Sequence, residues 1–246
     1  MKLVVRSTVL LSFLAPASRA DEAAPRHAPD AADTAARSTL PLQPAELAHG
    51  PTGRVTGGWD GARDHALVEG TAAAPIHPRV TVTALVQRRV DDRLAPGLGV
   101  EVAVVAPTGS SLAVSAGLRY RPEGFDEPEG EVEATLALGV RTDATTLVAN
   151  LAYGQDPEGN ERDAELAIGV MRTVHRSWQL GASARVRDGL GTTAELGADR
   201  DGFATAFAGA RFAGHAAVAV GAGVAVVDDG ALHAGPAVST SLAVAF

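Results

Sequence analysis

The stretch Pro236-Ala-Val-Ser-Thr-Ser-Leu-Ala-Val-Ala-Phe246 alternates strictly between two kinds of side chain. The larger set consists of Val238, Thr240, Leu242, Val244 and Phe246. The smaller set consists of Ala237, Ser239, Ser241, Ala243 and Ala245. A repeat of two residues is the period of a β-strand. One apolar face and a final aromatic residue predict a strand of a closed barrel whose outer face contacts lipid.

The same alternation recurs in 110–120, 131–141 and 178–187, and charged side chains fall almost only on the smaller-residue face. A charge on the lipid-facing side near the middle of a bilayer costs about 2–4 kcal/mol, so membrane insertion would enforce this segregation. A soluble barrel or sandwich with its apolar face inward is the alternative, and the alternation by itself does not reject it. Six aromatic residues near strand ends are candidates for the interfacial belts of a membrane barrel: Trp59, Tyr120, Tyr153, Trp178, Phe203 and Phe246.

The pattern predicts an all-β chain, an antiparallel up-and-down transmembrane barrel of about 12 strands, with 10–14 compatible with the pattern. The predicted strands are 53–60, 65–75, 79–90, 96–106, 110–121, 131–141, 145–154, 163–172, 176–187, 202–212, 215–227 and 236–246. The first two are weak, and Thr192 to Asp199 is ambiguous. Short connections, such as 107–109, 142–144 and 173–175, alternate with longer ones, such as 122–130, 155–162 and 228–235. Membrane barrels alternate short periplasmic turns with longer outer loops in this way.

The first residues predict export. Lys2 and Arg6 precede an apolar stretch, and Ser18-Arg19-Ala20 offers a cleavage site for a signal peptidase. We therefore expect residues 1–20 to be a signal peptide, 21–51 to be a flexible Ala/Pro-rich periplasmic segment, and 52–246 to be the barrel. Folding of the 21–51 segment into the lumen as a plug remains an alternative.

The chain has no cysteine, which excludes disulfides and thiolate sites. Its formal net charge is −8, and removal of the expected leader makes it about −11. Such an acidic chain is a poor partner for nucleic acid.

Eight charged residues on the predicted inner face form the candidate lumen site: Glu101, Arg119, Glu131, Glu133, Arg141, Glu165, Arg185 and Arg187. One interpretation is a transverse field that orients a polar solute in an open channel. The other is internal ion pairing inside a filled barrel.

The sequence predicts no enzyme, no cofactor and no metal site. The histidines are scattered, and none of the nucleophile, zinc or phosphate-loop motifs occurs. Asp156, Glu158 and Asn160 have the spacing of the start of a calcium loop, but Gly159 is misplaced and Ala167 stands where an acidic residue would close the motif. A solvated outer loop is the preferred interpretation.

The terminal strand resembles the C-terminal signature of Gram-negative outer-membrane β-barrel proteins, where a final Phe is typical. The resemblance covers 52–246 by pattern and is specific only at 236–246. It implies location in the cell outer membrane, contact with outer-membrane lipid, and assembly by the barrel insertion machinery, with Val238, Leu242, Val244 and Phe246 as the insertion signal.

A porin-like or transporter-like channel for small solutes is the leading function. A structural or adhesive outer-membrane barrel with a filled lumen and a secreted soluble all-β protein are the alternatives.

Overall fold

The computed structural model describes residue 47 and residues 50–88, 94–105, 112–122, 130–142, 144–157, 162–175, 177–190, 200–212, 215–228 and 231–246. Within this part of the chain, no helix is long and apolar enough to cross a membrane.

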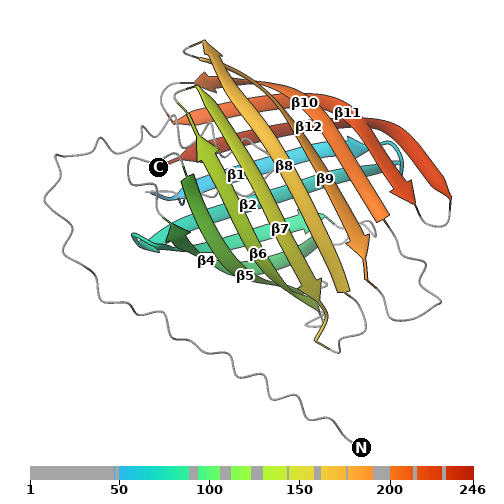
Figure 1. Cartoon of the computed structure of the whole chain (residues 1–246), viewed down its shortest axis with the longest axis horizontal. Coiled ribbons are helices and arrows are strands. Elements are labelled where there is room, and N and C mark those ends of the chain that lie inside the picture. Colours follow the sequence, from blue (N-terminus) through green and yellow to red (C-terminus); the bar gives the residue numbers. More distant parts are fainter. Residues whose placement is uncertain are drawn as a thin grey trace, which may run out of the picture.

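Twelve antiparallel strands form one closed barrel, in which each strand pairs with its neighbours in sequence (Figure 1). The strands are β1 (Thr52–Asp60), β2 (His65–His77), β3 (Val80–Arg88), β4 (Leu94–Val105), β5 (Leu112–Pro122), β6 (Gly130–Arg141), β7 (Thr145–Gln155), β8 (Arg162–His175), β9 (Trp178–Gly189), β10 (Arg200–Phe212), β11 (Ala216–Asp228) and β12 (Leu232–Ala245). The predicted fold class and all twelve predicted strands are confirmed, including the two weak ones. The ambiguous segment 192–199 lies outside the described residues.

The barrel closes where the first strand pairs with the last. The register of this seam runs from Thr52 opposite Ala245 to Asp60 opposite Ala237. Beyond the strands, the backbone N–H of Phe246 donates to the carbonyl of Pro51 at 2.9 Å. The alternating strand that predicted the fold is therefore the one that removes the last free edge of the sheet.

The two ends of the barrel differ in their connections. The terminal end holds the start of β1 and the end of β12, and the opposite, loop end holds the connections 61–64, 89–93, 123–129, 156–161, 190–199 and 229–231.

The predicted alternation of short and long connections is only partly correct. Residues 173–175, predicted as a turn, belong to β8, and the loop predicted at 228–235 shortens to 229–231 because β12 begins at Leu232. Small residues at Ala234 and Gly235 allow this extension against β11.

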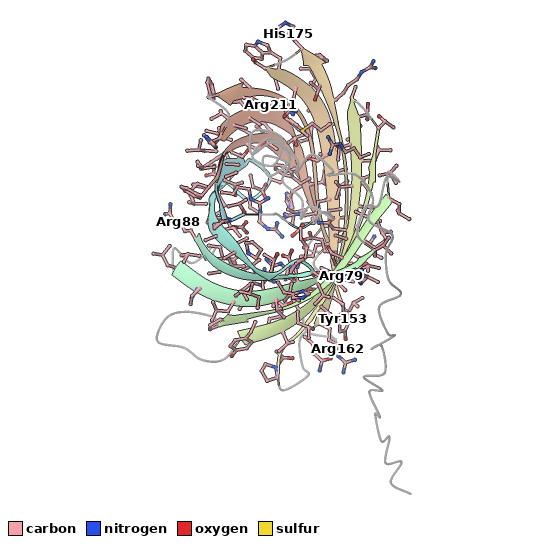
Figure 2. The ribbon with its side chains drawn as sticks, turned by 90° about the vertical axis from the view of Figure 1, so that its left-hand side faces the viewer. Arg79, Arg88, Tyr153, Arg162, His175 and Arg211 are labelled. Carbon is pink, nitrogen blue, oxygen red and sulfur yellow. The ribbon has the colours of Figure 1, made fainter. Side chains whose placement is uncertain are left out.

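The outer face of the barrel is apolar over its middle. Leucine, valine and isoleucine side chains project outward from most strands and are exposed, for example Leu98, Leu136 and Ile168. Outward-facing charged residues of the described strands lie near strand ends: Arg88, Arg162, Arg172, Asp188, Arg200 and Asp228. Figure 2 shows Tyr153 and Arg162 together at the loop end and His175 at the opposite end. This is the surface that a bilayer requires, with charges only at the depth of the headgroups.

Five of the six predicted belt aromatics are exposed: Trp59, Tyr120, Tyr153, Trp178 and Phe246. Phe203 is an exception and a correction. It stands opposite Arg185 in the β9–β10 register, and it therefore shares the inner face with that arginine. Phe212, the last residue of β10, takes an exposed outward position that the prediction missed.

Small residues line the inner face of β11 because neighbouring backbones approach it closely. A Cβ on Gly223 would overlap the carbonyl oxygen of Ala204 on β10, and one on Gly221 would lie 3.1 Å from the Cβ of Phe207. The small Ala and Gly residues of this face therefore reflect close packing between β10 and β11.

Replacement of Gly223 by Ala should destabilise the barrel, because backbone rather than a flexible side chain must move. Overpacking of this kind costs about 1–3 kcal/mol. The loss should appear as a lower temperature for the heat-induced shift in gel migration of the folded barrel. Gly53→Ala is the matched control, since a Cβ there meets nothing within 4 Å. Equal melting of the two variants would contradict this packing account.

Candidate functional site

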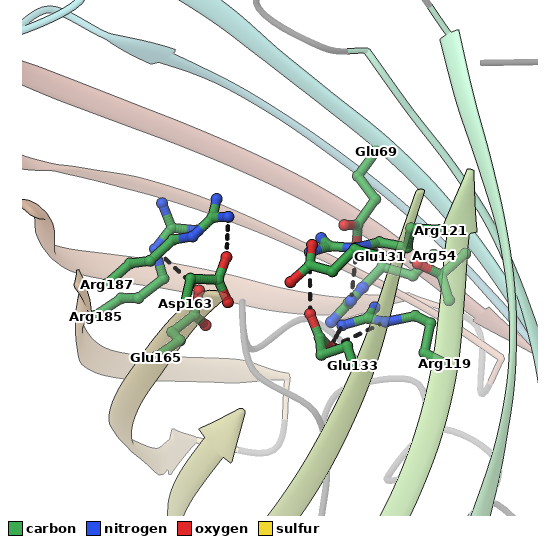
Figure 3. Close-up of polar contacts among 11 residues, drawn as sticks. Arg54, Glu69, Arg119, Arg121, Glu131, Glu133, Asp163, Glu165, Arg185 and Arg187 are labelled. Atoms are coloured by element: carbon green, nitrogen blue, oxygen red, sulfur yellow. Dashed lines mark hydrogen bonds and ion pairs between the residues drawn. The ribbon is translucent and has the colours of Figure 1, made fainter. Parts of the chain in front are cut away.

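All eight predicted lumen charges occupy inward positions of their strands, which supports the predicted alternation of the two faces. Glu101 lies on β4, where its Cγ is 3.2 Å from the position of a Cβ on Gly117. Arg141 ends β6 at the terminal end. The other six belong to two groups of ion pairs on the inner face, which Figure 3 shows as separate neighbours.

The first cluster joins β1, β2, β5 and β6. Arg119 pairs with Glu133 on the next strand, and Arg121 Nη2 lies 2.7 Å from Glu131 Oε2 and 3.1 Å from Glu133 Oε2. Arg54 Nη2 lies 3.2 Å from Glu69 Oε1. Figure 3 shows Glu69 next to Arg121 as well as Arg54, so the cluster brings β2 and β5 together on the inside of the barrel.

The second cluster joins β8, β9, β10 and the β1–β2 loop. Arg187 donates to Asp163, and Arg185 lies 3.9 Å from Glu165 and 3.8 Å from Asp201. Arg63 Nη1 lies 3.2 Å from Asp201 Oδ2. It also lies 3.6 Å from Asp60 Oδ2. Asp60 in turn accepts from the backbone N–H of Ala62 at 3.0 Å, which holds this loop over the lumen wall.

A glycine separates the two clusters. Gly154 on β7 stands opposite Glu133 on one side and Asp163 on the other. A Cβ at this position would overlap the carboxylate of Glu131 and lie 2.8 Å from Asp163 Oδ1. The side chain of Glu131 therefore reaches over β7 toward Asp163, and only the absence of a side chain at residue 154 leaves space for it.

Most residues of the two charged clusters lie toward the loop ends of their strands, and Arg54, near the start of β1, is the exception. Val148, Ala167, Met171, Phe207 and Ala219 form a buried apolar cluster on the inner face. The hydroxyls of Ser183 and Thr205 bond to each other at 3.1 Å.

Arg211 is the next-to-last residue of β10 and lies close to the terminal end of the barrel. Its guanidinium donates to Thr173 Oγ1 at 3.3 Å. The carboxamide oxygen of Gln179 accepts from Arg211 Nη2 at 2.8 Å in the amide orientation that satisfies both groups.

Among the described residues, no group of three or more His, Cys, Asp or Glu side chains has an arrangement that would hold a metal ion. The acidic loops 122–130 and 155–162 lie mostly outside those residues, so Glu158 and Asn160 of the abandoned calcium pattern are not described. The lumen clusters are the site that the structure offers.

Sequence reasoning missed seven of the thirteen charged residues described in the two clusters: Arg54, Asp60, Arg63, Glu69, Arg121, Asp163 and Asp201. Arg121 and Asp163 sit at the loop ends of their strands, and alternation counted from Arg119 and Glu165 places both on the inner face. Asp201 follows the same rule on β10, although its predicted strand began one residue too late. Arg54 and Glu69 lie on the two weakly patterned strands. The contact of Arg63 depends on the path of a loop, which no periodicity reports.

No protein-family model and no curated protein matches this sequence. Solved structures match it by fold. A structure of the NanC porin has a TM-score of 0.59 at 8% identity, covering 79% of this chain and 100% of that one. The KdgM porin in complex with disordered oligogalacturonate has a TM-score of 0.57 at 9% identity, covering 79% of this chain and 99% of that one. A bacterial polysaccharide outer membrane secretin has a TM-score of 0.50 at 10% identity and covers 82% and 100%.

This chain has a porin-like fold. The likeness extends over nearly the whole length of the NanC and KdgM chains, so it includes the closed barrel and not a fragment of it. At these identities the likeness concerns the fold alone, and the lumen residues of this chain have to be interpreted from its own geometry.

The Glu133 carboxylate should be the most important single charge for stability, because it is 7% exposed and two arginines pair with it. Glu133→Gln should lower the unfolding free energy by about 2 kcal/mol, the range for hydrogen bonds to charged groups. Glu165→Gln is the matched control. Glu165 is 31% exposed and 3.9 Å from its partner, so its loss should cost less. Urea titration of tryptophan fluorescence in detergent measures both, and a larger loss at Glu165 would contradict the ranking.

Proposed function

We propose that this protein is an outer-membrane channel for small hydrophilic solutes. The observation that carries the proposal is the division of one closed barrel into an apolar, outward-facing wall and an inward-facing wall that holds the charged groups. A lipid environment explains the first, and a watery lumen explains the second. The porin-like fold supports the same assignment. The proposal includes no enzymatic step.

The orientation follows from the connections. Outer-membrane barrels keep short turns and both termini in the periplasm. We therefore place the terminal end in the periplasm and the loop end at the cell surface, with most residues of the two charged clusters toward the outer end of the lumen. Residues 1–20 act as the signal peptide in this proposal, and 21–51 precede the barrel on the periplasmic side.

Surface labelling tests this orientation. A cysteine at Pro157, in an exposed position beyond β7, should react with an impermeant maleimide on whole cells. A cysteine at Ala144, in the exposed turn between β6 and β7, should react only after the outer membrane is permeabilised. The parent chain has no cysteine, so it provides the blank. The opposite labelling pattern would place the loop end in the periplasm.

The last strand should also direct insertion, with Val238, Leu242, Val244 and Phe246 facing lipid. Phe246 is 80% exposed, so Phe246→Asp removes little packing from the folded barrel. It should nevertheless lower the amount of protein in the outer-membrane fraction several-fold and leave the chain to periplasmic proteolysis. Phe212→Asp, at an exposed outward aromatic of β10, is the control for a charge at the membrane edge. Normal yield of Phe246→Asp would remove this role from the terminal residue.

Conductance measurements test whether the protein is a channel. Purified protein in planar bilayers should produce stepwise channel openings. Two lumen arginines, Arg185 and Arg187, are 41% and 44% exposed, so changing both to Gln should alter ion preference toward cations without unfolding the barrel. Protein that inserts but never conducts, and melts far below the parent after this double change, would favour a structural barrel with a filled lumen.

A further inference from the structure

We infer that the channel selects solutes without net charge that carry many hydroxyl groups, such as neutral sugars, and discriminates against acidic ones. This inference rests on the proposed channel function. It concerns the same lumen and follows from how the charges there are paired.

The described inner face, together with the loop residue Arg63 that contacts it, carries equal numbers of positive and negative side chains. The positive residues are Arg54, Arg63, Arg119, Arg121, Arg141, Arg185, Arg187 and Arg211. The negative residues are Asp60, Glu69, Glu101, Glu131, Glu133, Asp163, Glu165 and Asp201. Neither sign dominates this part of the lumen.

Opposite charges on neighbouring strands are also paired: Arg54 with Glu69, Arg119 with Glu133, and Arg187 with Asp163. Arginines on β5 and β9 flank the carboxylates of β6 and β8, so each row of one sign lies beside a row of the other. Charge-selective pores present rings of one sign to the passing solute. A close pair acts at a distance only as a dipole, and salt weakens its field further, with a screening length of about 8 Å at physiological ionic strength. A free ion therefore gains little attraction here while it loses hydration.

The exposed parts of the pairs suit hydroxyl groups. On β9, Arg185 and Arg187 are 41% and 44% exposed, whereas Asp163 behind them is 14% exposed. A guanidinium has five N–H donors, and a carboxylate partner occupies only some of them. Donors on the exposed part of each guanidinium remain available beside carboxylate acceptors such as Glu165. A hydroxyl both donates and accepts, so it can bond to either member of a pair without breaking it.

An acidic solute meets a different situation. A carboxylate on the solute has to compete for each guanidinium with the carboxylate already bound, and it adds a negative charge beside Glu131 and Asp163, whose oxygens already approach each other over Gly154. Like charges at this separation repel. The acidic ligand named with the KdgM porin is therefore not the one this lumen favours.

Uptake into proteoliposomes tests the inference with three sugars of one ring geometry: galactose, galacturonate and galactosamine. Galactose should enter several-fold faster than galacturonate, and a KCl gradient across a bilayer should give a reversal potential near zero. Faster entry of galacturonate, or a strong anion preference, would overturn the inference while leaving the channel function intact. Absence of conductance and of all uptake would instead reject the proposed function.

Two lumen variants test whether the balance of charges, rather than the shape of the lumen, sets solute selectivity. Arg185→Gln with Arg187→Gln should slow galacturonate further, speed galactosamine, and move the reversal potential toward that of a cation channel. Adding Asp163→Asn and Glu165→Gln restores the charge balance and should return the reversal potential to that of the parent. If the balanced variant keeps the cation preference of the double variant, pairing does not set selectivity and the inference fails.

Discussion

Hydrogen bonding of the backbone in lipid is the constraint on which this structure depends. A bilayer core offers no water to an unpaired N–H or carbonyl, so a sheet within it must have no edge. Pairing of β1 with β12 satisfies this requirement, from Thr52 opposite Ala245 to Asp60 opposite Ala237. Once the sheet is closed, the period of two divides every strand into one lipid-facing and one lumen-facing row, and the remaining chemistry follows from that division.

The second constraint is that the lumen holds many charges in a confined space. In both clusters some charged groups have two partners of opposite sign. Arg121 lies between Glu131 and Glu133, and Asp201 lies between Arg63 and Arg185. Ion pairs of this kind need additional bonds to offset desolvation. Shared partners provide them, and they also join strands that are distant in sequence, such as β10 and the β1–β2 loop.

The architecture was predictable because alternation is a local property that every strand displays. Inner and outer rows could be assigned without any contact information, and the outward Leu98, Leu136 and Ile168 follow that assignment. Pairing between charged residues was less accessible. It depends on register, and the two-residue difference between the predicted start at 202 and the observed start of β10 at Arg200 hid Asp201. Phe203 failed as a belt residue because position near a strand end says nothing about face, whereas its register against Arg185 does.

The seam has a consequence for how the barrel is made. Thr52 and Ala245 are neighbours in space but lie at opposite ends of the folded sequence, so the contact that removes both edges is also the least local one in the molecule. Loop-closure entropy delays such contacts until most of the intervening chain is ordered. Until then β1 and β12 each present a row of unpaired backbone groups, which are sites for mispairing with another chain. The barrel is thus most vulnerable to aggregation immediately before it is complete, and anything that holds β12 during that interval acts as a chaperone for the whole sheet.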